Sequence, residues 1–115
     1  MIVNKSKNIV IANEHKVCDN IFTRMRGLMF HKRIDDYGLV FVFNKDVMAS
    51  IHMLFVFFSI DILWLDHEKR VVEMKRSIAP FTPHISPKNR CRYFIEVEKG
   101  TIEEKGIEVG DLIEW

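Results

Sequence analysis

Three polar side chains in otherwise apolar runs could carry chemistry. Asp61 stands between Ile60 and Ile62 in a run that is typical of an interior strand. A carboxylate in such a place must be hydrogen-bonded, paired or protonated to avoid a large desolvation penalty. His52 lies in a second apolar run, and Glu96 alternates with apolar neighbours. If the three side chains met, two carboxylates and one imidazole would suit a divalent metal ion.

Each of these residues also has a structural interpretation. We expect Asp61 either to pair with an arginine such as Arg26 or to accept backbone N–H groups where strands cross. His52 is expected to be a satisfied core histidine, and Glu96 a solvated or salt-bridged glutamate on the face opposite its apolar neighbours. The candidate ligand-binding residues are therefore Arg26, His52, Asp61 and Glu96. The sequence predicts no catalytic residue, no bound metal and no cofactor.

The motifs that usually carry catalysis are missing from the sequence. It contains no glycine-rich phosphate loop, nucleophile elbow, His-Glu-x-x-His helix or calcium loop. Basic residues gather at 24–33, but Asp35 and Asp36 follow at once, so a nucleic-acid-binding stripe is not expected. Cys18 and Cys91 have no second cysteine nearby, as a zinc site or redox motif would need, and are expected to be reduced core thiols.

Length and charge limit the class of protein. The chain has 115 residues, of which 48% are hydrophobic, and this predicts a single domain over residues 1–115. Its 17 Lys and Arg residues against 16 Asp and Glu residues give a net charge of +1, so neither nucleic acid nor an anionic membrane is an expected partner. No signal peptide is apparent, and no apolar run reaches the roughly 20 residues of a membrane-spanning helix. We expect a cytoplasmic protein that is a monomer or a weak dimer.

The spacing of apolar residues is mostly that of strands. Strands are expected near residues 8–13, 39–43, 47–57, 60–65, 70–78, 91–98 and 112–115, with a turn at 44–46. Asp19 can cap a helix over residues 20–28, in which Gly27 marks either the helix end or a close approach to another element. A helical turn is expected at 101–105, closed by Gly106. Three prolines between Pro80 and Asn89 predict an irregular loop.

Six to eight short strands with little helix predict a mainly β fold. Because strands and helices do not alternate along the chain, a doubly wound sheet is not expected. The prediction is a compact antiparallel sandwich or barrel with one short N-terminal helix and a helical turn near the C-terminus.

Five blocks of sequence, in order and at matching spacing from about Arg24 to the C-terminus, resemble the DUF192 family, also called UPF0127. The blocks are Arg26-Gly27-Leu28-Met29-Phe30, Tyr37-Gly38-Leu39-Val40-Phe41-Val42-Phe43, Ile60-Asp61-Ile62-Leu63-Trp64-Leu65-Asp66, Tyr93-Phe94-Ile95-Glu96-Val97 and Gly106-Ile107-Glu108-Val109-Gly110-Asp111. The resemblance is to short, leaderless, archaeal-like members of the family. It implies a mainly β, jelly-roll-like domain and brings no biochemical activity with it.

Three functions agree with these observations. The favoured one is a non-enzymatic binding module that holds a small molecule or a peptide in a cleft between the sheets, rimmed by residues 80–89 and the Arg26 segment. The first alternative is a small metal-dependent hydrolase that uses His52, Asp61 and Glu96. The second is a protein–protein interaction domain that uses an exposed edge strand or the C-terminal Trp115.

Overall fold

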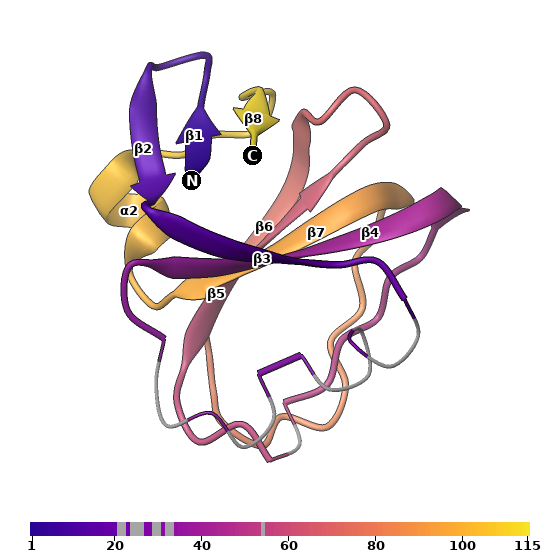
Figure 1. The fold of residues 1–115 in the computed structure, drawn as a ribbon. Helices are drawn as coiled ribbons and strands as arrows, with labels where there is room; N and C mark the ends of the chain where they lie inside the picture. The colour runs from indigo at the N-terminus through magenta and orange to yellow at the C-terminus, as the bar shows by residue number, and fades with distance from the viewer. Residues whose placement is uncertain (21–22, 24–26, 29–30, 32–33, 54) are drawn as a thin grey trace.

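Two β-sheets of unequal size form the fold (Figure 1). The structure, a computed structural model, describes residues 1–20, 23, 27–28, 31, 34–53 and 55–115. The smaller sheet has the order β2-β1-β8, and the larger has the order β3-β4-β7-β5-β6. In chain order the elements are β1 (Ile2–Asn4), β2 (Ile9–Ala12), β3 (Glu14–Cys18), β4 (Tyr37–Val47), β5 (Ile60–Leu65), β6 (Val71–Ile78), β7 (Cys91–Glu98), the helix α2 (Thr101–Lys105) and β8 (Ile113–Glu114). The predicted mainly β sandwich is confirmed.

One strand pair departs from the predicted antiparallel arrangement. The pairs β4–β7, β7–β5 and β5–β6 are antiparallel, whereas β3 and β4 run parallel, from Glu14 opposite Tyr37 to Cys18 opposite Phe41. A parallel pair needs a long crossover connection, and residues 19–36 supply it here. The expected helix over residues 20–28 falls in this connection and lies largely outside the described residues.

The space between the two sheets is filled by apolar side chains. Ile2 and Ile113 of the smaller sheet and Ile102 of α2 pack on the inner face of the larger sheet, and all three are fully buried. A Cβ atom placed on Gly38 would overlap Cδ1 of Ile2, so the sheets approach closely there. The inner face of the larger sheet is formed by Val40, Leu63, Leu65, Ile95 and Val97. Among the described residues, apolar side chains fill this interior; the Arg26 segment that was expected to rim a cleft lies outside them.

Loops cover the other face of the larger sheet, at the bottom of Figure 1. The strand expected over 47–57 and the turn expected at 44–46 are both wrong, because β4 continues to Val47 and the chain then crosses the sheet without regular structure. Backbone bonds to the proline-containing loop replace strand pairing: Ile51 and Ile85 exchange two N–H···O bonds of 2.8 Å. The indole N–H of Trp64 donates to the carbonyl of Ala49 at 3.1 Å and fixes the start of the crossing.

Two local predictions are confirmed. Gly106 closes α2 in the left-handed conformation, with a φ of 61°, as expected for a helix end. Gly27 has a φ of 48°, and a Cβ atom there would lie 3.4 Å from Cζ of Phe41 and 3.5 Å from Oε1 of Glu96. The backbone at Gly27 therefore runs close over the sheet. This agrees with the second of the two interpretations of Gly27, a close approach to another element.

Candidate functional site

Three of the residues singled out in the sequence, His52, Asp61 and Glu96, do not form one site. Asp61 pairs with Val97 and Ile62 with Glu96, so the carboxyl groups of Asp61 and Glu96 point to opposite faces of the same sheet. His52 is exposed in the irregular segment after β4, and Arg26 lies outside the described residues. Within the described part of the chain, no three His, Cys, Asp or Glu residues could hold a metal ion. A metal site made of His52, Asp61 and Glu96 is therefore wrong, and so is the hydrolase built on it.

Asp61 caps the N-terminus of α2 from a neighbouring strand. Its Oδ2 accepts the backbone N–H groups of Gly100 at 3.1 Å and Ile102 at 3.0 Å, and its Oδ1 accepts that of Ser77 at 2.8 Å. The side chain is fully buried, so these three bonds replace its hydration. This is the second of the two structural arrangements that the sequence allowed. Asp61 thus holds β5, β6 and α2 together and faces the inter-sheet core.

Glu96 is buried on the opposite face, beneath Gly27. The expectation of a solvated or salt-bridged glutamate is wrong, because β7 is an inner strand whose two faces are both covered; only 4% of Glu96 is exposed. Burial raises the pKa of its carboxyl group to about 8. The side chain is therefore mostly uncharged at neutral pH.

The expectation of a core histidine at His52 is also wrong, because residues 47–57 do not form an interior strand.

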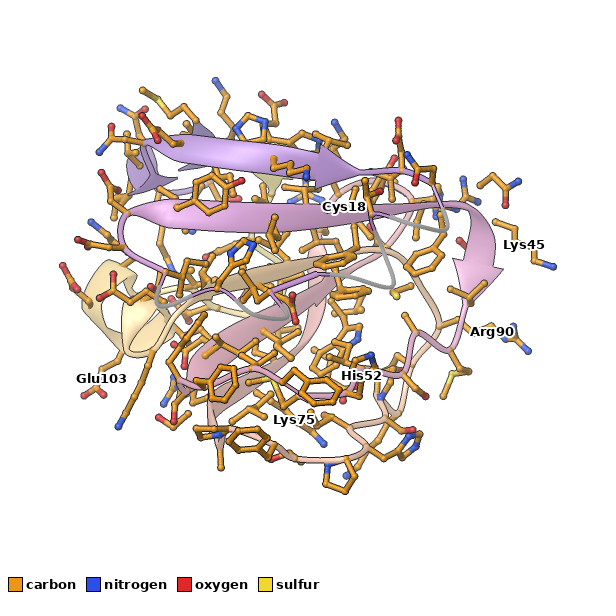
Figure 2. The ribbon with its side chains drawn as sticks, turned by 60° about the horizontal axis from the view of Figure 1, so that its bottom comes forward. Cys18, Lys45, His52, Lys75, Arg90 and Glu103 are labelled. Atoms are coloured by element: carbon orange, nitrogen blue, oxygen red, sulfur yellow. The ribbon has the colours of Figure 1, made fainter. Side chains whose placement is uncertain are left out.

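The two loops over the sheet are joined by backbone hydrogen bonds. We call the outer surface of residues 48–59 and 79–90 the aromatic loop face; it comes forward in Figure 2. The N–H of Met53 donates to the carbonyl of Thr82 at 2.7 Å, and the N–H of Phe81 donates to the carbonyl of Met53 at 2.9 Å. Met53 itself is fully buried. Its backbone therefore anchors both loops to each other and its side chain anchors them to the core.

Large aromatic side chains stand exposed on this face. The exposed fractions are 49% for Phe55, 56% for Phe57 and 50% for Phe81. The rings of Phe57 and Phe81 meet edge to face, with centroids 5.1 Å apart and an interplanar angle of 86°. Phe55 and Phe81 have φ values of 59° and 63°, a conformation that costs a non-glycine residue on the order of 1–3 kcal/mol. Strained backbone that presents apolar rings to solvent is typical of a binding surface.

The two loops that form this face contain basic residues and no acidic residue. The sequence has no Asp or Glu from residue 47 to 60 or from residue 74 to 95. Figure 2 shows His52 and Lys75 on this face and Arg90 at its edge. The exposed basic residues of these segments are His52, Lys75, Arg76, His84, Lys88 and Arg90. Lys75 and Arg76 are consecutive in β6, so their side chains point to opposite faces of the sheet.

The exposed phenylalanines were not found from the sequence, because the run from Met53 to Phe58 has the composition of a buried strand. A signal was present in Pro80-Phe81-Thr82-Pro83. A phenylalanine between two prolines cannot lie in an interior strand and has to be placed on a loop.

A separate cavity lies at one end of the sandwich, between β2, β4 and α2. Its volume is about 330 Å³, and its polar lining includes Asp35, Asp36, Glu98, Glu104 and Lys105. Neither the residues at 80–89 nor any candidate binding residue lines it. This cavity is therefore not the cleft expected from the sequence, whose Arg26 rim lies outside the described residues.

Comparison with known proteins identifies the family. The model of DUF192, described as "Uncharacterized ACR", matches residues 2–115. The chain belongs to the DUF192 family. Among DUF192 relatives, a UPF0127 protein of Pyrococcus horikoshii is 41% identical over 100% of this chain and 98% of its own length. A UPF0127 protein of Thermococcus sibiricus is 38% identical over 100% of this chain and 74% of its own length.

Two crystal structures share the DUF192 fold described above. A protein from Sinorhizobium meliloti superposes with a TM-score of 0.83 at 20% identity, covering 87% of this chain and 79% of its own. A protein of unknown function from Novosphingobium aromaticivorans also superposes at 0.83, with 23% identity over 88% and 74% of the two chains. At these identities the likeness concerns the fold alone.

Among the described residues, no helix is both long and apolar enough to span a membrane.

Proposed function

We propose that this chain is a non-enzymatic binding module whose ligand is a peptide segment of another protein, docked on the aromatic loop face. The observation that carries the proposal is the exposure of Phe55, Phe57 and Phe81 on two hydrogen-bonded loops. Buried aromatic anchors supply much of the binding energy of protein interfaces. Half-exposed rings on a fixed backbone provide such anchors before the partner arrives.

An open surface favours a peptide over a small molecule. Small-molecule sites are usually concave and enclose most of the ligand, whereas these rings project from loops. The bonds between Met53 and residues 81–82 hold the loops in one arrangement. A surface that is already ordered loses less conformational entropy on binding, which favours affinity.

Binding rather than catalysis agrees with the positions of the carboxyl groups. Asp61 is occupied by three backbone donors on the far side of the sheet, and Glu96 is buried beneath Gly27. Neither side chain is presented on the aromatic loop face. The proposal therefore assigns the candidate carboxyls to the folded scaffold and the recognition to the phenylalanines.

Selection from a random peptide library displayed on phage tests this proposal. The immobilised protein should enrich peptides with apolar or aromatic anchors, and the double variant Phe57→Ser/Phe81→Ser should no longer retain them. Val109→Ser is the matched control, because Val109 is 63% exposed and lies outside the two loops. The proposal fails if no sequence is enriched, or if the enriched peptides bind the double variant as well as they bind the unmodified protein.

A further inference from the structure

We infer that the peptide recognised by the aromatic loop face is acidic, with carboxylates between its apolar anchors. This inference rests on the proposed function and adds the chemical class of the partner. The observation behind it is that the two loops carrying the exposed phenylalanines contain no acidic residue, while Lys75, Arg76 and Lys88, in or near them, are exposed and form no ion pair among the described residues.

Three basic residues in and near the two loops form no ion pair among the described residues. Lys75, Arg76 and Lys88 are exposed, and within the described ranges no carboxylate lies at ion-pair distance from any of them. Glu73 is the acidic residue that precedes the acid-free stretch of β6, and its Oε1 accepts the backbone N–H of Lys88 at 2.8 Å. The Glu73 carboxylate thus bonds the loop backbone, and the Lys88 ammonium group forms no ion pair among the described residues.

Some basic residues elsewhere in the chain form ion pairs, whereas Lys16, Lys45 and Lys99 are exposed and have no ion pair among the described residues. Lys7 lies 2.6 Å from Glu108 and 3.0 Å from Asp111, and Arg92 lies 3.1 Å from Asp46. What marks the aromatic loop face is that neither of its two loops contains an acidic residue, although the whole chain carries only +1. Complementary charge at an interface speeds association and selects among partners.

The charge also argues against a second copy of this chain as the occupant. A twofold contact through the aromatic loop face would place Lys75 and Lys88 near the same residues of the other copy. Like charges brought together in this way oppose association. A partner that brings carboxylates to the rim and apolar side chains to the rings satisfies both features of the surface.

Three synthetic peptides provide the test. All three have the same Leu and Phe anchors. At every position between the anchors, the first peptide has Glu, the second Gln and the third Lys. Their affinities are measured by fluorescence anisotropy at about 20 mM and about 300 mM NaCl. At low salt the Glu peptide should bind about tenfold more tightly than the Gln peptide, and the Lys peptide more weakly than both. The differences should shrink at high salt, because surface charges are then screened.

Charge-reversed variants assign the effect to this face. Lys75→Glu/Lys88→Glu should reverse the order of the Glu and Lys peptides and leave the Gln peptide unchanged. The matched control is Lys5→Glu. Lys5 follows β1 in the smaller sheet, beyond the larger sheet from the loops, and its ammonium group lies 4.0 Å from the Glu114 carboxylate. The control should keep the original order of affinities.

The outcomes separate this inference from the proposed function. If the Gln peptide binds through Phe57 and Phe81 but the three peptides have equal affinity, the acidic partner is excluded and the binding module stands. If no peptide binds, both proposals fail. Binding of phosphatidylglycerol vesicles without peptide binding, or a dimer in light scattering that Phe57→Ser/Phe81→Ser dissociates, would replace the acidic peptide by a membrane or by a second copy.

Discussion

The rings of Phe57 and Phe81 pack edge to face, 5.1 Å apart, although 24 residues separate them in the sequence. Both side chains are half exposed, and the buried Met53 connects their loops through its backbone. The pair is therefore formed without burying either ring. Packing of this kind adds little to the stability of the folded chain and leaves most of each ring available to a partner.

The left-handed backbone at Phe81 predicts an unusual order of stability. Phe81→Gly should be more stable than Phe81→Ala by about 1 kcal/mol, because glycine adopts a φ of 63° without strain and alanine does not. At positions with a negative φ, a glycine variant is usually less stable than the alanine variant. Urea denaturation of the two variants measures the difference, and an alanine variant that is the more stable one would show that the backbone at residue 81 is not strained.

Removing the Asp61 carboxylate should destabilise the fold. Asp61→Ala leaves the N–H groups of Ser77, Gly100 and Ile102 without their acceptor and should lower the free energy of unfolding by about 2–4 kcal/mol. Asp61→Asn should cost less, because its amide oxygen can still accept part of these bonds. Chemical denaturation checks both, with Glu103→Ala, an exposed acidic residue of α2, as the control. An unchanged midpoint and slope in Asp61→Ala would refute the capping role.

The buried Glu96 predicts a pH dependence of stability. Its pKa is about 8 in the folded chain, against an ordinary value of 4.5, so between these values the folded state keeps a proton that the unfolded state has lost. The free energy of unfolding should therefore fall as pH rises through this window, by an amount on the order of a few kcal/mol. Glu96→Gln mimics the protonated form and should flatten the profile. Urea titrations at about pH 5, 7 and 8.5 test this, and equal slopes for the two proteins would contradict it.

The two cysteines should be unreactive in the native protein. Cys18 and Cys91 are free and buried, and burial raises the pKa of both thiols, to about 11 for Cys91. Because the thiolate is the reactive form, labelling by an aromatic disulfide reagent at neutral pH should be slow until denaturant is added. Two thiols per chain should then react without a reducing agent. Recovery of an intact disulfide between Cys18 and Cys91 would overturn this prediction.

The sequence indicates the scaffold better than the recognition surface, for reasons visible at particular residues. In β5 the sequence places Ile60, Ile62 and Trp64 on one face and Asp61 and Leu63 on the other, and the structure has the same two faces. This prediction needs only the alternation of side chains along a strand, which is a local property. The parallel β3–β4 pair could not be predicted, since it depends on the path of the connection between them.

The errors at the candidate site have the same origin. Glu96 looks like an outward-facing residue in an alternating strand, and only the three-dimensional packing shows that loops cover that face. The run from Met53 to Phe58 has the composition of a strand, but strands β4 and β5 already have other neighbours. Its phenylalanines are therefore left on an irregular crossing, partly exposed to solvent.

The location of the binding surface is tested most directly by amide chemical-shift mapping. Isotope-labelled protein is titrated with the Gln peptide, whose binding does not depend on charge. We expect the largest shifts at residues 51–58 and 79–86, centred on Phe57 and Phe81. Shifts confined to the cavity lined by Asp36, Glu98 and Glu104, with the aromatic loop face unchanged, would contradict this expectation.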